Sequence, residues 1–234
     1  SFMLCRVVFI WYNWNVFDGN LDKDVILKML PGALKFDTAG IMYLTVPYML
    51  LTMLPFHFKE NRTYYTIVKV ILIILVSAGI AANLIDTVYF PFTGCRSTLN
   101  VLAEFKNESG GQMRSIVMNA VMENWYLVLL FIVMVWVLCI TIRIPVAVQY
   151  KRLSVYYIVK TGLLLVCVFA SVVGIRGGIS TSIRPITMSN AYQYADRPAD
   201  AAAVLNTPFC VIRTAGRVKI EVPRYFSEEE LEKI

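Results

Sequence analysis

The chain has 234 residues, of which 58% are hydrophobic and only 16% carry a charged side chain. A soluble domain is charged at about a quarter of its residues, so this composition indicates a membrane protein with several spans. The net charge of +6 is spread along the chain, much of it beside apolar runs, and gives no indication of a nucleic-acid partner.

The pattern of apolar runs predicts an all-α membrane protein with five transmembrane helices and short interfacial helices. The predicted spans cover residues 1–17, 38–56, 67–89, 125–142 and 153–175. One interfacial helix is expected at residues 24–34, and a further amphipathic helix is expected in the loop between the third and fourth spans. Residues 1–178 thus form a transmembrane domain. Residues 179–234 are too polar to span and are expected to be a juxtamembrane linker with short helices.

Local signals in that linker predict where its helices begin. Ser189 and Asp200 are plausible N-caps, and Pro208 suits a first turn. Ser227 with the glutamates after it resembles a capping box. The chain starts inside an apolar run at Ser1 and stops in a charged stretch, so we expect a piece of a longer protein.

Basic residues are denser in the two short links between spans than in the two long loops. The links hold Lys59 and Lys151 among their basic residues. By the positive-inside rule they face the cytoplasm, so the long loops and residues 179–234 face outward.

The third predicted span ends in a polar and aromatic region. Asn83 and Asp86 are three residues apart and share a helix face. Tyr89, Phe90 and Phe92 follow at the expected headgroup level, and Gly94 closes a turn before Arg96. We expect Asp86 to look into the bundle and Arg96 to face lipid headgroups; the alternative is that the two merely pair. Arg6, in the first span, is expected to pair within the bundle.

The sequence contains no recognisable catalytic motif or metal-ligand spacing. There is one histidine, His57, and no CxxC motif. Asp37 and Asp86 would suit a proton relay in a transporter, but both lie near the outer ends of spans, whereas transport sites usually lie near the midplane. Cys95 and Cys210 lie in polar segments and are expected to be free thiols.

Several short segments resemble the membrane region of the lipoteichoic acid synthase family, which includes phosphoglycerol transferases. They are residues 83–90 (NLIDTVYF) with 96–98 (RST), 35–37 (KFD), 176–178 (RGG) and 205–209 (LNTPF). The resemblance marks Asp37, Asn83, Asp86, Arg96 and Arg176 as lipid-headgroup or structural polar candidates. It implies a bacterial cytoplasmic membrane protein with an extracytoplasmic C-terminal segment.

The resemblance further implies an α/β sulfatase-like catalytic domain outside these 234 residues. That domain would use a divalent metal (Mn, Mg or Zn) to move a phosphoglycerol group from phosphatidylglycerol. No catalytic residue and no cofactor is placed in this chain. Two other interpretations stay open: phosphoethanolamine transfer or sulfatase activity in the same superfamily, and a non-enzymatic transporter or scaffold.

Overall fold

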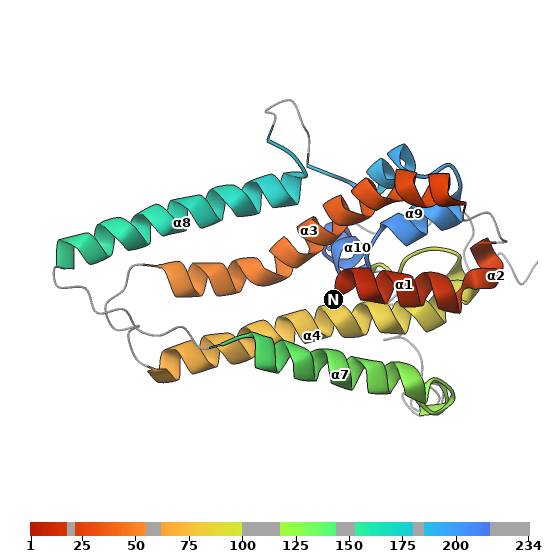
Figure 1. Ribbon diagram of the computed structural model, residues 1–234, viewed down its shortest axis with the longest axis horizontal. Helices are drawn as coiled ribbons and strands as arrows, with labels where there is room; N and C mark the ends of the chain where they lie inside the picture. The colour runs from red at the N-terminus through yellow and green to blue at the C-terminus, as the bar shows by residue number, and fades with distance from the viewer. Residues whose placement is uncertain (18–21, 55–61, 100–117, 144–152, 180–184, 216–234) are drawn as a thin grey trace, which may run out of the picture.

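The structure is a computed structural model that describes residues 1–17, 22–54, 62–99, 118–143, 153–179 and 185–215. Within these ranges the chain forms helices and no strand, as the sequence predicts. Four long helices, α3, α4, α7 and α8, run lengthwise, and short helices from both ends of the chain gather at one end of the molecule (Figure 1).

The first predicted span is two helices and not one. Helix α1 covers Phe2–Tyr12 and α2 covers Trp14–Phe17. The break falls at Asn13, whose side-chain amide donates to the carbonyls of Phe9 and Thr87, both at 3.0 Å. Asn13 therefore ends α1 and ties it to the helix that contains Thr87.

The predicted interfacial helix and the second span are one continuous helix. Helix α3 runs over Lys23–Met53 and contains Pro31 and Pro47. Proline removes one backbone N–H and so frees the carbonyl four residues earlier. For Pro31 that residue is Leu27, which is exposed, so solvent or lipid headgroups can take the place of the missing donor and the helix continues. The expectation of two separate elements was wrong.

Helix α4 covers Arg62–Thr93 and includes the third predicted span. It ends at Gly94, whose φ of 65° is the left-handed conformation that glycine adopts without steric cost. The expected turn at Gly94 is confirmed. The predicted helix in the following loop falls on residues 100–117 and lies outside the described residues.

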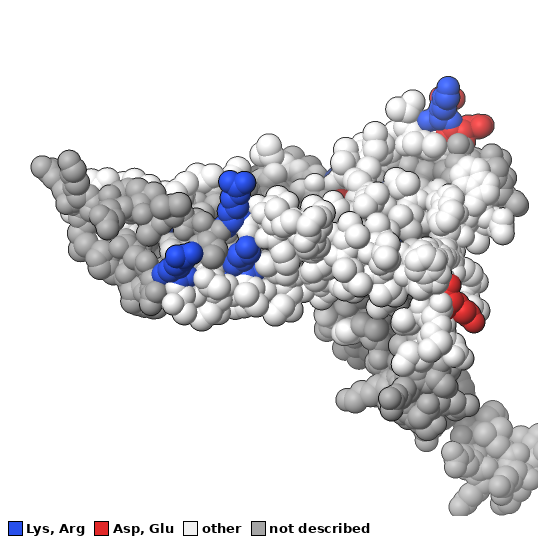
Figure 2. Space-filling view, turned by 60° about the horizontal axis from the view of Figure 1, so that its bottom comes forward, with Lys and Arg blue, Asp and Glu red and all other residues white. Residues whose placement is uncertain are grey.

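Helices α7 (Trp125–Thr141) and α8 (Leu153–Arg176) follow the predicted fourth and fifth spans closely. Of the described helices, α4 and α8 are long and apolar enough to cross a membrane, and α1 and α7 are shorter apolar helices. Figure 2 shows charged side chains toward the two ends of one face, with an uncharged surface between them. Membrane-length apolar helices are therefore present; the five-span layout stays a prediction.

The expected linker packs onto the bundle and is not a free segment. It forms the short helices η3 (Met188–Gln193), α9 (Pro198–Val204) and α10 (Thr207–Thr214). Helix α10 packs on α3 and α4, and α9 packs on α3 and α1. The N-caps are Thr187, Arg197 and Asn206, so the predicted caps Ser189 and Asp200 were wrong, whereas Pro208 does lie in a first turn. The predicted capping box at Ser227 lies outside the described residues.

The larger hydrophobic core joins this layer to the bundle. It includes Phe9, Phe36, Phe90 and Phe209, all fully buried. Phe36 and Phe209 meet edge to face with ring centroids 5.0 Å apart. Residues 185–215 and the ends of α1, α3 and α4 thus form one packed unit, which encloses the polar groups described next.

Candidate functional site

Buried polar side chains from five segments meet beneath α9 and α10. We call this set the polar core. Its members are Arg6 of α1, Asp37 of α3, Asn83 and Asp86 of α4, Arg96 and Ser97 after α4, and Asn206 and Thr207 at the start of α10. Except for Ser97, which is half-buried, each is at most 7% exposed. Buried polar groups need hydrogen-bond partners within the protein, and most polar atoms of this set have one; Arg6 Nε and Asp37 Oδ2 have none among the described residues.

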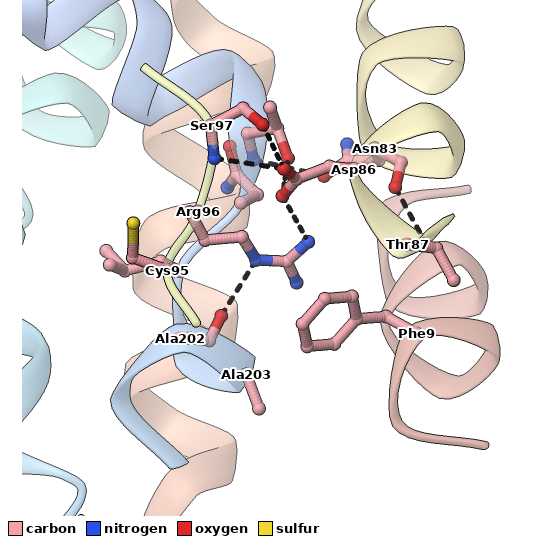
Figure 3. Close-up of polar contacts among 12 residues, drawn as sticks. Phe9, Asn83, Asp86, Thr87, Cys95, Arg96, Ser97, Ala202 and Ala203 are labelled. Carbon is pink, nitrogen blue, oxygen red and sulfur yellow. Dashed lines mark hydrogen bonds and ion pairs between the residues drawn. The ribbon is translucent and has the colours of Figure 1, made fainter. Parts of the chain in front are cut away.

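Asp86 is the acceptor at the centre of the first half of the polar core (Figure 3). Its Oδ2 accepts from Arg96 Nη1 at 3.0 Å and from the Thr207 hydroxyl at 2.8 Å. Its Oδ1 accepts from the backbone N–H of Ser97 at 2.9 Å and from the Ser97 hydroxyl. Both oxygens of this buried carboxylate therefore have hydrogen-bond partners within the protein.

Arg96 points into the protein and not to the lipid headgroups. Its Nε donates to the carbonyl of Ala202 at 2.8 Å, and its guanidinium carbon lies 3.5 Å from the centroid of the Phe9 ring (Figure 3). The side chain is 3% exposed in its pair with Asp86. The expectation that Arg96 faces headgroups was therefore wrong, and the alternative pairing with Asp86 is what the structure contains.

Arg6 and Asp37 form the second half of the polar core. Arg6 Nη2 pairs with Asp37 Oδ1, and Arg6 Nη1 donates to the carbonyl of Val204 at 2.6 Å and to that of Ala203. The expected pairing of Arg6 inside the bundle is confirmed. Its main-chain partners lie about 200 positions away in sequence, which no local pattern indicates.

Both arginines bind the carbonyl end of α9. Ala202, Ala203 and Val204 end this helix, and their carbonyls lack intrahelical partners. Arg96 binds the first and Arg6 the other two. Positive charge at a helix C-terminus is favourable, because the helix dipole is negative there. The two arginines thus hold α9 to the bundle through adjacent carbonyls.

Asn206 connects the two halves through the start of α10. Its amide donates to the carbonyl of Phe36 at 2.8 Å and to Asp37 Oδ1 at 3.1 Å, while its oxygen accepts from the N–H of Phe209 at 2.9 Å. Asn206 can come this close to α3 only because residue 40 is a glycine: a Cβ there would lie 2.7 Å from Asn206 Oδ1. Next to it, the N–H of Thr207 donates to Asn83 Oδ1 at 3.1 Å.

The structure brings four of the five predicted candidates together: Asp37, Asn83, Asp86 and Arg96. The fifth, Arg176, is half-buried and is the last residue of α8; Gly177 after it lies against Lys35. Asn206 and Thr207 were not predicted as site residues. The sequence did contain a signal for them: Asn206 and Thr207 directly precede Pro208, which is the pattern of a capped helix start.

The two cysteines predicted to be free thiols are free in the structure, and they differ in exposure. Cys95 is exposed and Cys210, in α10, is fully buried. Burial raises the pKa of the Cys210 thiol to about 12, since the thiolate would lose its hydration. Cys210 is therefore a small apolar packing group.

The polar core carries charge but offers no reactive group. Asp37 and Asp86 each have their own arginine, so the proposed proton-relay use has no support in this geometry. Among the described residues no three His, Cys, Asp or Glu side chains gather as a metal site. The arrangement holds the backbone of α9 and α10 in place.

Comparisons with protein-family models, with curated proteins and with solved structures gave no match. The functional argument therefore starts from the polar core and from the apolar helices around it.

Proposed function

We propose that this chain is the membrane module of a lipid headgroup transferase that takes phosphoglycerol from phosphatidylglycerol at the outer face of the bacterial cytoplasmic membrane. The resemblance of residues 83–90, 96–98 and 205–209 to the lipoteichoic acid synthase family suggests this activity. In this proposal the module has five spans, and residues 185–215 lie at its outer end.

One observation supports the proposal most directly: residues that lead away from the last membrane helix are fastened to the bundle by a buried ionic network. Both arginines of the polar core bind α9, and Asn206 and Thr207 bind α3 and α4. A flexible tether would need none of these bonds. An enzyme whose lipid donor stays in the bilayer needs its active site held at a fixed height, and a rigid connection provides that.

The polar core is assigned a positioning role and no catalytic one. The divalent metal that the resemblance implies does not fit the described residues, which contain no group of three metal ligands. In this proposal the metal and the nucleophile belong to a catalytic domain outside residues 1–234. A phosphoethanolamine donor would be consistent with the same module.

The test is to read the coding sequence past Ile234 and assay its full product. Membranes with the protein receive fluorescent phosphatidylglycerol, with and without Mn²⁺ and a chelator. The proposal predicts a sulfatase-type domain downstream and metal-dependent formation of fluorescent diacylglycerol. A reading frame that ends at Ile234, or a full product that leaves phosphatidylglycerol intact but cleaves phosphatidylethanolamine, would contradict it.

A further inference from the structure

An apolar groove runs between α3 and α8. Its cavity is about 200 Å³ and is lined by Val46, Met49 and Leu50 on one side and by α8 residues from Leu164 to Ile175 on the other. The volume is below the range of about 300–1,000 Å³ for pockets that enclose a whole drug-sized ligand. A groove of this size suits one linear segment of a larger molecule.

The α8 side of the groove extends over about one leaflet, whereas the α3 side is limited to Val46, Met49 and Leu50. From Leu164 to Ile175 there are eleven helical steps, or roughly 16 Å at 1.5 Å per residue. Half of a hydrocarbon core of about 30 Å is nearly the same distance. Helix α8 packs on α3 at one edge of the bundle (Figure 1), and most of its apolar side chains are exposed. The groove is therefore lateral and accessible from the bilayer.

A cation lies at one end of the groove. Gly177, two residues past Ile175, lies under the Lys35 side chain: a Cβ on Gly177 would be 2.4 Å from Lys35 Cε. Lys35 forms no ion pair with any residue that the structure describes.

We infer that the α3–α8 groove binds one acyl chain of an anionic glycerophospholipid, whose phosphate lies at Lys35. The chain enters sideways from the outer leaflet, and the ammonium of Lys35 pairs with the phosphate at the interface. The inference rests on the membrane-spanning part of the proposed function and not on the transfer reaction.

The experiment is photolabelling in nanodiscs, with peptides mapped by mass spectrometry. Two probes carry a diazirine midway along one acyl chain: anionic phosphatidylserine, which is not the proposed donor, and zwitterionic phosphatidylcholine. Labels are expected on groove residues of α3 and α8. Val168→Trp, which fills the groove, should remove them, whereas Val166→Trp, at an exposed position outside the groove lining, should not.

Two further variants test the contact between Lys35 and the lipid phosphate. Lys35→Gln should lower labelling by the phosphatidylserine probe about fivefold, the effect of one basic residue at an anionic surface. It should lower labelling by the phosphatidylcholine probe by less, because the choline ammonium already compensates that phosphate. Lys28→Gln, on the same helix, should change neither. Equal labelling of the two probes, or no effect of Lys35→Gln, would overturn the phosphate contact. Labelling spread evenly around α8, or a groove covered by a second copy of the chain, would overturn the acyl-chain site.

Discussion

The described residues include a buried and an exposed ion pair, and the difference in burial determines how much each contributes to stability. Asp86 and Arg96 are 1% and 3% exposed, whereas Asp196 and Lys28 are 80% and 47% exposed. Removing one partner of a buried pair leaves an uncompensated charge and costs about 3–5 kcal/mol. An exposed pair contributes about 0–1 kcal/mol.

Asp86→Ala is therefore expected to lower the stability of the folded protein by about 3–5 kcal/mol, while Asp196→Ala changes it by less than about 1 kcal/mol. The measurement is thermal or denaturant unfolding in detergent micelles. Arg96→Ala should be as harmful as Asp86→Ala, and the double variant no worse than either. Additive losses would show that the two side chains do not act as a pair.

Cys95 and Cys210, two of the five free thiols, should differ in reactivity. In the folded protein at pH 8, a thiol reagent is expected to modify exposed Cys95 and leave Cys210 unmodified; after denaturation both react. Modification of Cys210 at the rate of Cys95 would contradict the burial of α10.

Cys210 also predicts a pH dependence of stability. Burial raises its folded pKa from 9.0 to about 12, so the folded state keeps the proton that the unfolded state releases. The contribution of the buried Cys210 thiol to the stability of the folded state is complete below pH 9.0 and is lost as the pH rises toward about 12. Cys210→Ala should flatten the decline of unfolding midpoint between pH 9 and 11, compared with the parent protein.

At the scale of the element, α10 depends on a close approach that only glycine permits. Gly40→Ala would place a Cβ 2.7 Å from Asn206 Oδ1 and displace the N-cap of α10. Hydrogen exchange of residues 207–214 is expected to accelerate, with α7 unchanged. Gly162→Ala is the matched control: it is also in a helix, but nothing lies within 4 Å of the new Cβ. Faster exchange in both variants would point to a general effect of the substitution.

The elements were predictable to the extent that local pattern determines them. Apolar runs marked α4, α7 and α8, and the three-residue spacing of Asn83 and Asp86 placed both in the interior. The continuity of α3 across residues 35–37 was missed because Lys35 and Asp37 indicated a charged loop, whereas Asp37 is buried in the helix and pairs with Arg6. The burial of Arg96 was missed because its second partner, the carbonyl of Ala202, is 106 positions away.

At the scale of the whole molecule, the charges of one face separate toward its ends. Among the described residues that Figure 2 colours, those toward the end where α3 finishes and α4 begins are Lys and Arg, and both signs occur toward the other end. This agrees with the positive-inside rule and with the proposed orientation.

The orientation predicts which positions a membrane-impermeant thiol reagent reaches in intact cells. In a Cys95→Ser background, Lys28→Cys is expected to react and Arg143→Cys to react only after permeabilisation. Both positions are exposed, so access to the side chain does not distinguish them. The reverse labelling pattern would show that the molecule has the opposite orientation in the membrane.

The two ion pairs of the polar core also differ in when they can form during synthesis. Asp86 and Arg96 are ten positions apart, so they can meet as soon as α4 leaves the ribosome. Arg6 reaches Asp37 after 31 positions, but its carbonyl partners are made nearly 200 positions later. Until residues 203 and 204 have been synthesised, Arg6 of α1 can pair with Asp37 but lacks the two carbonyls of α9 that it binds in the finished fold.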